Sequence, residues 1–149
     1  MSAIAYDAAR NLAVAGFPDW WQARRGMPPA STPIRHLVLV LGDQLSPDSV
    51  AFAGFDPARD RVLMVEAREE SEHVPSTRMR SALFLAAMRH FAQALTAERA
   101  WTVDYLRLGA HRFETIADAL DDALARHRPQ ALVMAEAGEW RLAQAIAQC

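Results

Sequence analysis

Short apolar runs rich in β-branched residues recur along the chain, and each run ends at polar side chains. The first run, residues 36–41, reads His-Leu-Val-Leu-Val-Leu and stops at Gly42, Asp43 and Gln44. Three further runs cover residues 61–66, 101–108 and 131–135. Such runs, bounded by polar residues, are typical of strands buried on both faces of a parallel sheet. Residues 101–108 alternate with charged positions, which places this run nearer an edge of the sheet.

Segments with apolar residues at helical spacing separate these runs. We expect helices over residues 48–53 (capped by Ser46), 77–97, 113–127 and 139–147. The long helix should present one apolar face, made of Met79, Leu83, Phe84, Ala87, Met88, Phe91 and Leu95. Strands that alternate with helices predict βαβ units with right-handed crossovers. The predicted fold is α/β, a Rossmann-like three-layer αβα arrangement with a mostly parallel sheet of about four strands.

Residues 1–33 lack this alternation. A weak helix over residues 8–14 and a short helical turn over 17–26 precede a proline-rich stretch at 27–33. We interpret residues 1–33 as an N-terminal extension and linker, and residues 34–149 as the folded domain. The alternative is a strap in which Trp20 and Trp21 cover an apolar patch.

Composition argues against several classes of function. The formal net charge is −2, whereas a domain that holds nucleic acid alone is usually basic, so we expect no direct nucleic-acid binding. The single cysteine, Cys149, can form neither an internal disulfide nor an iron–sulfur cluster, and a cytoplasmic location is the default. No apolar run approaches the roughly 20 residues of a membrane helix. The N-terminus also lacks the layout of a signal peptide.

The polar clusters that follow the strands should meet at one edge of the sheet, where parallel sheets bind ligands. The clusters contain neither a Gly-x-Gly-x-x-Gly motif nor a Walker lysine, and they show no nucleophile or metal-ligand spacing. We therefore expect a ligand site without a metal and without nucleophilic catalysis. Trp140, which follows the last strand, is expected to pack in the core beneath this edge.

Several segments, taken in order, carry a resemblance to a known family. They are residues 39–45 (Leu-Val-Leu-Gly-Asp-Gln-Leu), 62–66 with Glu69, Glu70 and Val74, 82–92, 126–129 and 136–141. Together they resemble the N-terminal domain of the photolyase-related proteins, the bacterial cryptochromes and (6-4) photolyases that carry an iron–sulfur cluster. The resemblance covers roughly residues 35–142.

The resemblance implies an antenna module that binds 6,7-dimethyl-8-ribityllumazine and passes excitation energy to a flavin. The positions that match the antenna pocket are Gly42, Asp43, Gln44, Glu70, His73, Glu136, Gly138 and Glu139. By resemblance and side-chain chemistry, Asp43 and Gln44 would hydrogen-bond the ring edge, Glu70 the ribityl hydroxyls, and His73 would stack. His73 stands where the family commonly has an aromatic residue, and Ala137 stands where it usually has proline.

In the family, FAD, a four-iron cluster and damaged DNA bind a larger helical domain that this sequence does not contain. We therefore expect a fragment or truncated product with no activity alone, whose exposed apolar surface leads to dimerisation or aggregation. One alternative is a complete small α/β protein that binds a nucleotide- or pterin-like metabolite. Another is a remnant that retains only its fold.

Overall fold

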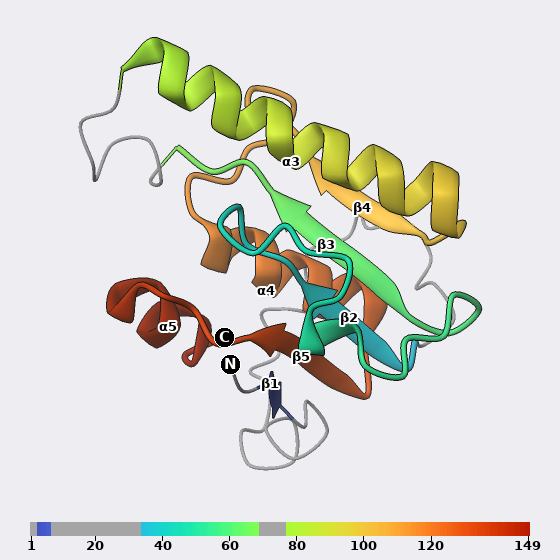
Figure 1. The fold of residues 1–149 in the computed structure, drawn as a ribbon. Coiled ribbons are helices and arrows are strands. Elements are labelled where there is room, and N and C mark those ends of the chain that lie inside the picture. Colours follow the sequence, from blue (N-terminus) through green and yellow to red (C-terminus); the bar gives the residue numbers. More distant parts are fainter. Residues whose placement is uncertain (1–2, 7–33, 69–76) are drawn as a thin grey trace.

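A computed structural model of the chain describes residues 3–6, 34–68 and 77–149, which form one sheet with helices on both faces (Figure 1). The strands are β1 (Ala3–Tyr6), β2 (His36–Leu39), β3 (Arg61–Val65), β4 (Val103–Leu106) and β5 (Ala131–Ala135). The helices are the 3₁₀ turn η2 (Val50–Phe52), α3 (Arg78–Arg99), α4 (Ile116–His127) and α5 (Trp140–Ile146). The predicted α/β class and three-layer arrangement are confirmed.

The sheet has the strand order β1-β5-β2-β3-β4. The four strands β5, β2, β3 and β4 run parallel, and β4 lies at the edge, as its charged positions predict. Strand β1, which no pattern predicted, pairs antiparallel with β5 from Ala3 opposite Ala135 to Tyr6 opposite Leu132. Backbone pairing at a sheet edge requires no particular apolar pattern. A strand of this length therefore leaves little trace in the sequence. The predicted helices at residues 8–14 and 17–26 lie outside the described residues.

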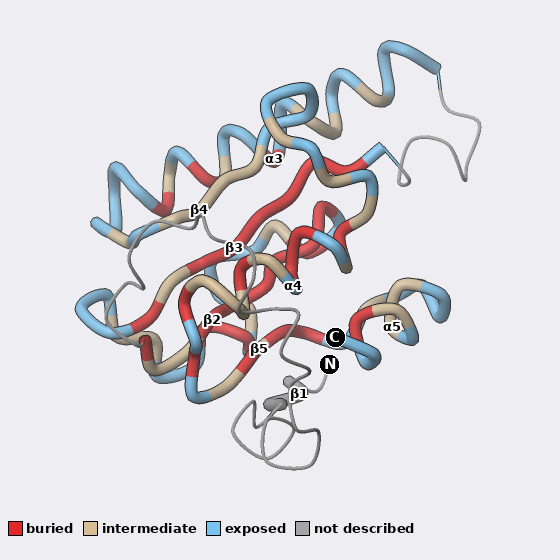
Figure 2. Tube along the Cα trace, turned by 180° about the vertical axis from the view of Figure 1, so that it is seen from behind, coloured by how far each residue is buried: buried red, intermediate tan, exposed pale blue. Residues whose placement is uncertain are grey.

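Alternate side chains of the strands build a core on each face of the sheet. Leu37, Leu39 and Leu63 pack against α4 and α5 on one face. Val38, Val62 and Met64 pack against α3 and η2 on the other. Figure 2 shows the central strands largely buried and the outer side of α3 exposed. The near-continuous apolar runs of the sequence are explained by this burial on both faces.

Helix starts differ from the predictions by a few residues, for local reasons. The first short helix is a 3₁₀ turn capped by Ser49, whose hydroxyl accepts a hydrogen bond from Ala51 N at 3.3 Å. The prediction of Ser46 as its cap is wrong, because the Ser46 hydroxyl instead accepts from Asp48 N at 3.4 Å, before the helix begins. Thr115 caps α4, so Phe113 packs on the core from outside the helix.

The apolar face predicted for α3 is only partly buried. Met88 and Leu95 are buried, whereas Met79 is 83% exposed and Leu83 is 71% exposed. The first turns of α3 extend past the end of β3, so no strand lies beneath them (Figure 1). Ala87, also part of the predicted face, is exposed. Phe84 and Phe91 are half-buried against the core, as expected.

Gly42, the residue that ends the first apolar run, allows α3 to lie close to the sheet. A Cβ atom at this position would lie 2.2 Å from Phe84 Cζ and 3.1 Å from Met88 Sδ. Both distances are too short for a relaxed contact with a packed side chain. Gly42 is therefore required by close packing.

We expect Gly42→Ala to lower the free energy of unfolding by about 1–3 kcal/mol, because the added methyl group overpacks the contact with Phe84. Urea denaturation followed by circular dichroism measures this loss. Gly138→Ala is the matched control, since its Cβ would meet only Asp43 Oδ2, at 3.5 Å. Equal losses in the two variants would show that Phe84 does not set the requirement.

Candidate functional site

The carboxyl ends of β2 and β5 border a pocket of about 360 Å³. The lining residues are Asp43, Gln44, Leu45, Ser46, Asp48, Ser49, Val50 and Ala135. Most come from the loop between β2 and η2, which leaves the sheet at Gly42 and returns to the core at Phe52. The volume falls in the range of about 300–1,000 Å³ that small-molecule sites occupy. The edge predicted from the polar clusters thus contains a pocket of suitable size.

Gln44 joins the two loops that form this edge. Its side chain is only 9% exposed, and its Nε2 donates to the carbonyl oxygen of Glu136 at 2.9 Å and to that of Ala135 at 3.4 Å. The amide nitrogen is thereby engaged within the protein. Gln44 therefore fixes the pocket wall rather than offering its amide N–H groups to a ligand.

The predicted site residues fall into three groups. Gly42 and Gln44 are buried. Asp43, Glu136, Gly138 and Glu139 are exposed, and the Asp43 carboxylate lies opposite Gly138. Glu70 and His73 lie outside the described residues. Of the predicted residues, Asp43 and Gln44 line the pocket, while Glu136 contacts Gln44 from the facing loop.

Sequence reasoning missed the part of the pocket formed by Ser46, Asp48, Ser49 and Val50. The sequence pattern predicts a helix from residue 48, with Ser46 as its cap, over this stretch. The hydroxyl-rich composition of the stretch after Gln44 was the available signal. Among the described pocket residues, the polar side chains are thus carboxylates, hydroxyls and one engaged amide, with no basic group.

Trp140 does not pack in the core: it is 73% exposed. Helix α5 begins at this residue and packs on the sheet through Leu142 and Ile146. Position 140 therefore points away from the core. The prediction of a buried tryptophan beneath the edge is wrong, because Leu142 and Ile146 form the packed face of α5.

The same edge of the sheet holds a buried carboxylate at the end of β3. The Glu66 side chain has no exposed surface. Arg89 Nε and Nη2 donate to its two oxygens at 2.7 and 2.8 Å, Tyr105 Oη donates at 2.6 Å, and Leu108 N donates at 2.8 Å. Four hydrogen bonds thus stabilise the carboxylate charge, whose burial would otherwise be energetically unfavourable.

These contacts determine how Glu66 titrates. Desolvation raises the pKa of its carboxyl, but the hydrogen bonds from Arg89, Tyr105 and Leu108 outweigh it and lower the pKa to about 2. Burial and the neighbouring Glu66 charge raise the pKa of the Tyr105 hydroxyl well above its usual value. At neutral pH the site therefore contains a carboxylate, a guanidinium and a neutral phenol.

The polar side chains that line the pocket can hydrogen-bond an organic ligand. Within residues 3–6, 34–68 and 77–149, no group of three or more His, Cys, Asp or Glu side chains is placed to hold a metal. The carboxylates of Asp43 and Asp48 and the hydroxyls of Ser46 and Ser49 line the pocket as hydrogen-bonding groups.

In the described part of the chain, no helix has the length and apolarity to cross a membrane.

Comparisons with known proteins point to one family. Residues 38–149 match the family model of the deoxyribodipyrimidine photo-lyase-related proteins. A (6-4) photolyase from Agrobacterium fabrum (strain C58 / ATCC 33970) is 35% identical over 107 residues, which is 71% of this chain and 21% of that protein. The chain therefore spans about a fifth of the length of this curated relative.

Glu66→Gln should lower the free energy of unfolding at pH 7 by about 1.5–3 kcal/mol, because the hydrogen bonds from Arg89 and Tyr105 lose their charged acceptor. The folded-state pKa of about 2 lies below the ordinary 4.5, so the carboxylate contributes its full stability above pH 4.5. That contribution is lost as the pH falls toward 2. Urea denaturation across this range should show a pH-dependent difference between the wild type and the variant that shrinks with acidification.

Asp122→Asn is the control for the Glu66 variant. Asp122 pairs with Arg112 at 3.4 Å and with Arg126 at 3.6 Å near the surface, where such pairs contribute about 0–1 kcal/mol. A loss in Glu66→Gln no larger than in this control would show that the buried Glu66 carboxylate adds no more stability than a surface ion pair.

Proposed function

The chain belongs to the photolyase-related protein family, and we propose that it is an antenna module whose pocket at the ends of β2 and β5 binds 6,7-dimethyl-8-ribityllumazine. The observation that carries the proposal is a pocket of about 360 Å³ at the ligand-binding edge of the sheet, lined by Asp43 and Gln44. Both residues belong to the motif on which the resemblance rests.

The chemistry of the pocket suits an uncharged ring system with hydroxyl groups. Asp43 and Asp48 supply carboxylates that accept hydrogen bonds, and Ser46 and Ser49 supply hydroxyls. A ribityl chain offers several O–H donors to such acceptors. The Gln44 bridge between the loops supports a rigid pocket, which an antenna needs because motion and water quench excitation.

In this proposal the protein holds and orients the chromophore and performs no bond-making step. The lumazine, when bound, absorbs light and passes the excitation energy to a flavin. Glu70 and His73 remain predicted contacts to the ribityl hydroxyls and the ring. We assign FAD, the iron–sulfur cluster and DNA repair to the larger helical domain of such proteins, and no described residue of this chain to them.

A nucleotide- or pterin-like metabolite is the second candidate ligand. The pocket lining favours an uncharged ligand over a nucleotide, because Asp43 and Asp48 would repel a phosphate group. A pterin-like ring without phosphate remains compatible with the same hydrogen-bonding groups. Competition between lumazine, a pterin and a mononucleotide separates these ligands.

A titration of the purified chain with 6,7-dimethyl-8-ribityllumazine tests the proposal. We expect saturable binding at micromolar levels with a shifted absorbance band and altered fluorescence. Asp43→Ala should weaken binding about tenfold or more, since it removes a charged hydrogen-bond acceptor. Glu98→Ala, which removes an exposed carboxylate from α3 outside the pocket, should leave the affinity unchanged. A folded sample that does not bind lumazine would overturn the proposal.

We also propose that the exposed start of α3 makes the chain self-associate. Met79 and Leu83 lie one turn apart on this helix, and contiguous exposed apolar surface favours association. Sedimentation equilibrium should show dimers or larger species, and the double variant Met79→Gln, Leu83→Gln should be monomeric. Ala97→Gln, at an exposed position near the other end of α3, should still associate. A wild-type monomer at high concentration contradicts this proposal.

A further inference from the structure

The outer edge of β4 leaves backbone groups unpaired. Thr102 O accepts from Val62 N at 3.0 Å, and Leu106 O accepts from Glu66 N at 2.9 Å. Backbone groups alternate in direction along a strand, so those of Val103 and Tyr105 face away from β3. These groups have no backbone partner among the described residues, because β4 is the last strand of the sheet on this side. The edge can therefore accept a further strand.

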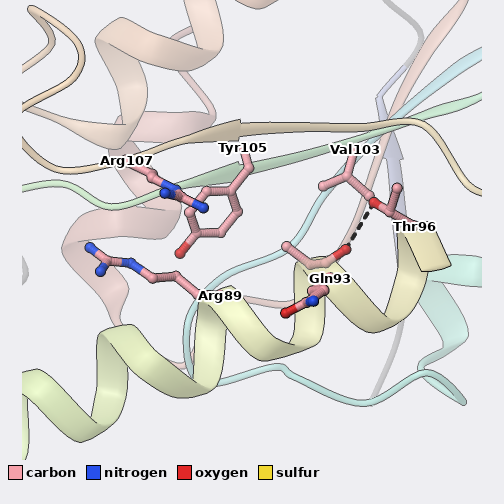
Figure 3. A pocket seen from close by; sticks show the side chains of 7 residues that line it. Arg89, Gln93, Thr96, Val103, Tyr105 and Arg107 are labelled. Atoms are coloured by element: carbon pink, nitrogen blue, oxygen red, sulfur yellow. Dashed lines mark hydrogen bonds between the residues drawn. The ribbon is translucent and has the colours of Figure 1, made fainter.

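A groove of about 520 Å³ runs between this edge and α3 (Figure 3). Its lining residues are Arg89, Ala92, Gln93, Thr96, Val103, Tyr105 and Arg107. The β4 residues in this lining are Val103 and Tyr105, whose backbone groups face away from β3. Arg107 lies just beyond the strand. A chain segment added to β4 would have alternate side chains against the lining of the groove.

One end of the groove is positively charged. Arg89 uses Nε and Nη2 for Glu66, and its side chain is still 44% exposed, so Nη1 remains available. Arg107 is exposed, and none of the ion pairs among the described residues includes it. In Figure 3 the Arg107 side chain lies beside Tyr105, above Arg89. The other end, at Ala92 and Val103, is uncharged.

We propose that this groove binds an extended acidic peptide segment of a partner protein, which adds to β4 as a further strand. An acidic side chain of the peptide pairs with Arg107 and Arg89, and a small apolar side chain four positions away packs near Val103. The free backbone groups of β4 supply hydrogen bonds, and the two guanidinium groups supply the preference for acid. The charge of the groove selects this occupant over a neutral or basic segment.

The test uses the blocked, dye-labelled heptapeptide Thr-Ala-Val-Thr-Val-Glu-Thr, which places the small and acidic side chains on one face. Fluorescence polarisation should show saturable binding to the full chain. A peptide with glutamine in place of glutamate should bind about fivefold or more weakly. Arg107→Gln should remove this difference between the two peptides, whereas Arg80→Gln, an exposed arginine outside the groove, should preserve it.

Amide hydrogen exchange provides a second readout that is specific for strand addition. Binding should slow exchange at Val103 and Tyr105, whose N–H groups face outward, and change it little at Asp104 and Leu106, which pair with β3. Val103→Pro removes one outward donor at a position where an edge strand tolerates proline, and should weaken binding of both peptides.

Three results would overturn the proposal. The first is equal binding of the glutamate and glutamine peptides to the wild type. The second is binding without slower exchange at Val103 and Tyr105. The third is displacement of the peptide by inorganic phosphate or by a single-stranded oligonucleotide at equal concentration, which would show that the groove recognises anions rather than strands.

Discussion

The carboxylate of Glu66 is the contact on which the arrangement of this domain depends. It lies at the end of β3, and its partners come from α3 (Arg89), β4 (Tyr105) and the loop that follows β4 (Leu108). The backbone oxygen of the same residue lies 3.0 Å from His111 Nε2. A buried charge is tolerated only when its hydrogen bonds are made, so α3, β4 and the loop must all be in place together. One side chain thereby couples elements that are far apart in the sequence.

The two ends of the sheet are closed by different means, and this difference explains where the pocket lies. At the amino end, buried Asp60 binds the Arg35 side chain and accepts from His36 N at 3.1 Å and Asp56 N at 2.8 Å. At the carboxyl end, Glu66 closes the half formed by β3 and β4. Among the described residues, the half formed by β2 and β5 has no buried charge and is bridged instead by the Gln44 amide. A single neutral bridge leaves room beside it, and the pocket occupies that room.

The sequence predicted the fold better than the site, for physical reasons. Buried parallel strands need continuous apolar runs, so the sequence predicted β2, β3 and β5. The charge of Asp104 within residues 101–108 indicated that β4 is an edge strand. Contacts that arise only after folding gave no local signal. A glutamate at the end of an apolar run does not reveal that an arginine 23 positions later reaches it, as Arg89 reaches Glu66. Similarly, composition alone could not show that Trp140 faces solvent or that Ser46 ends its turn before the helix.

Helix α3 connects the two proposed binding surfaces. Phe84 packs against Gly42, next to the pocket residue Asp43, and Arg89 lines the groove beside β4. These two side chains are five residues apart, roughly 7.5 Å along a rigid helix axis. Because Glu66 holds Arg89 by two hydrogen bonds, it also fixes how close Phe84 approaches the loop after β2. A movement of the helix toward the groove would separate Phe84 from Gly42, so the Glu66–Arg89 ion pair influences both the packing beside the pocket and the width of the groove.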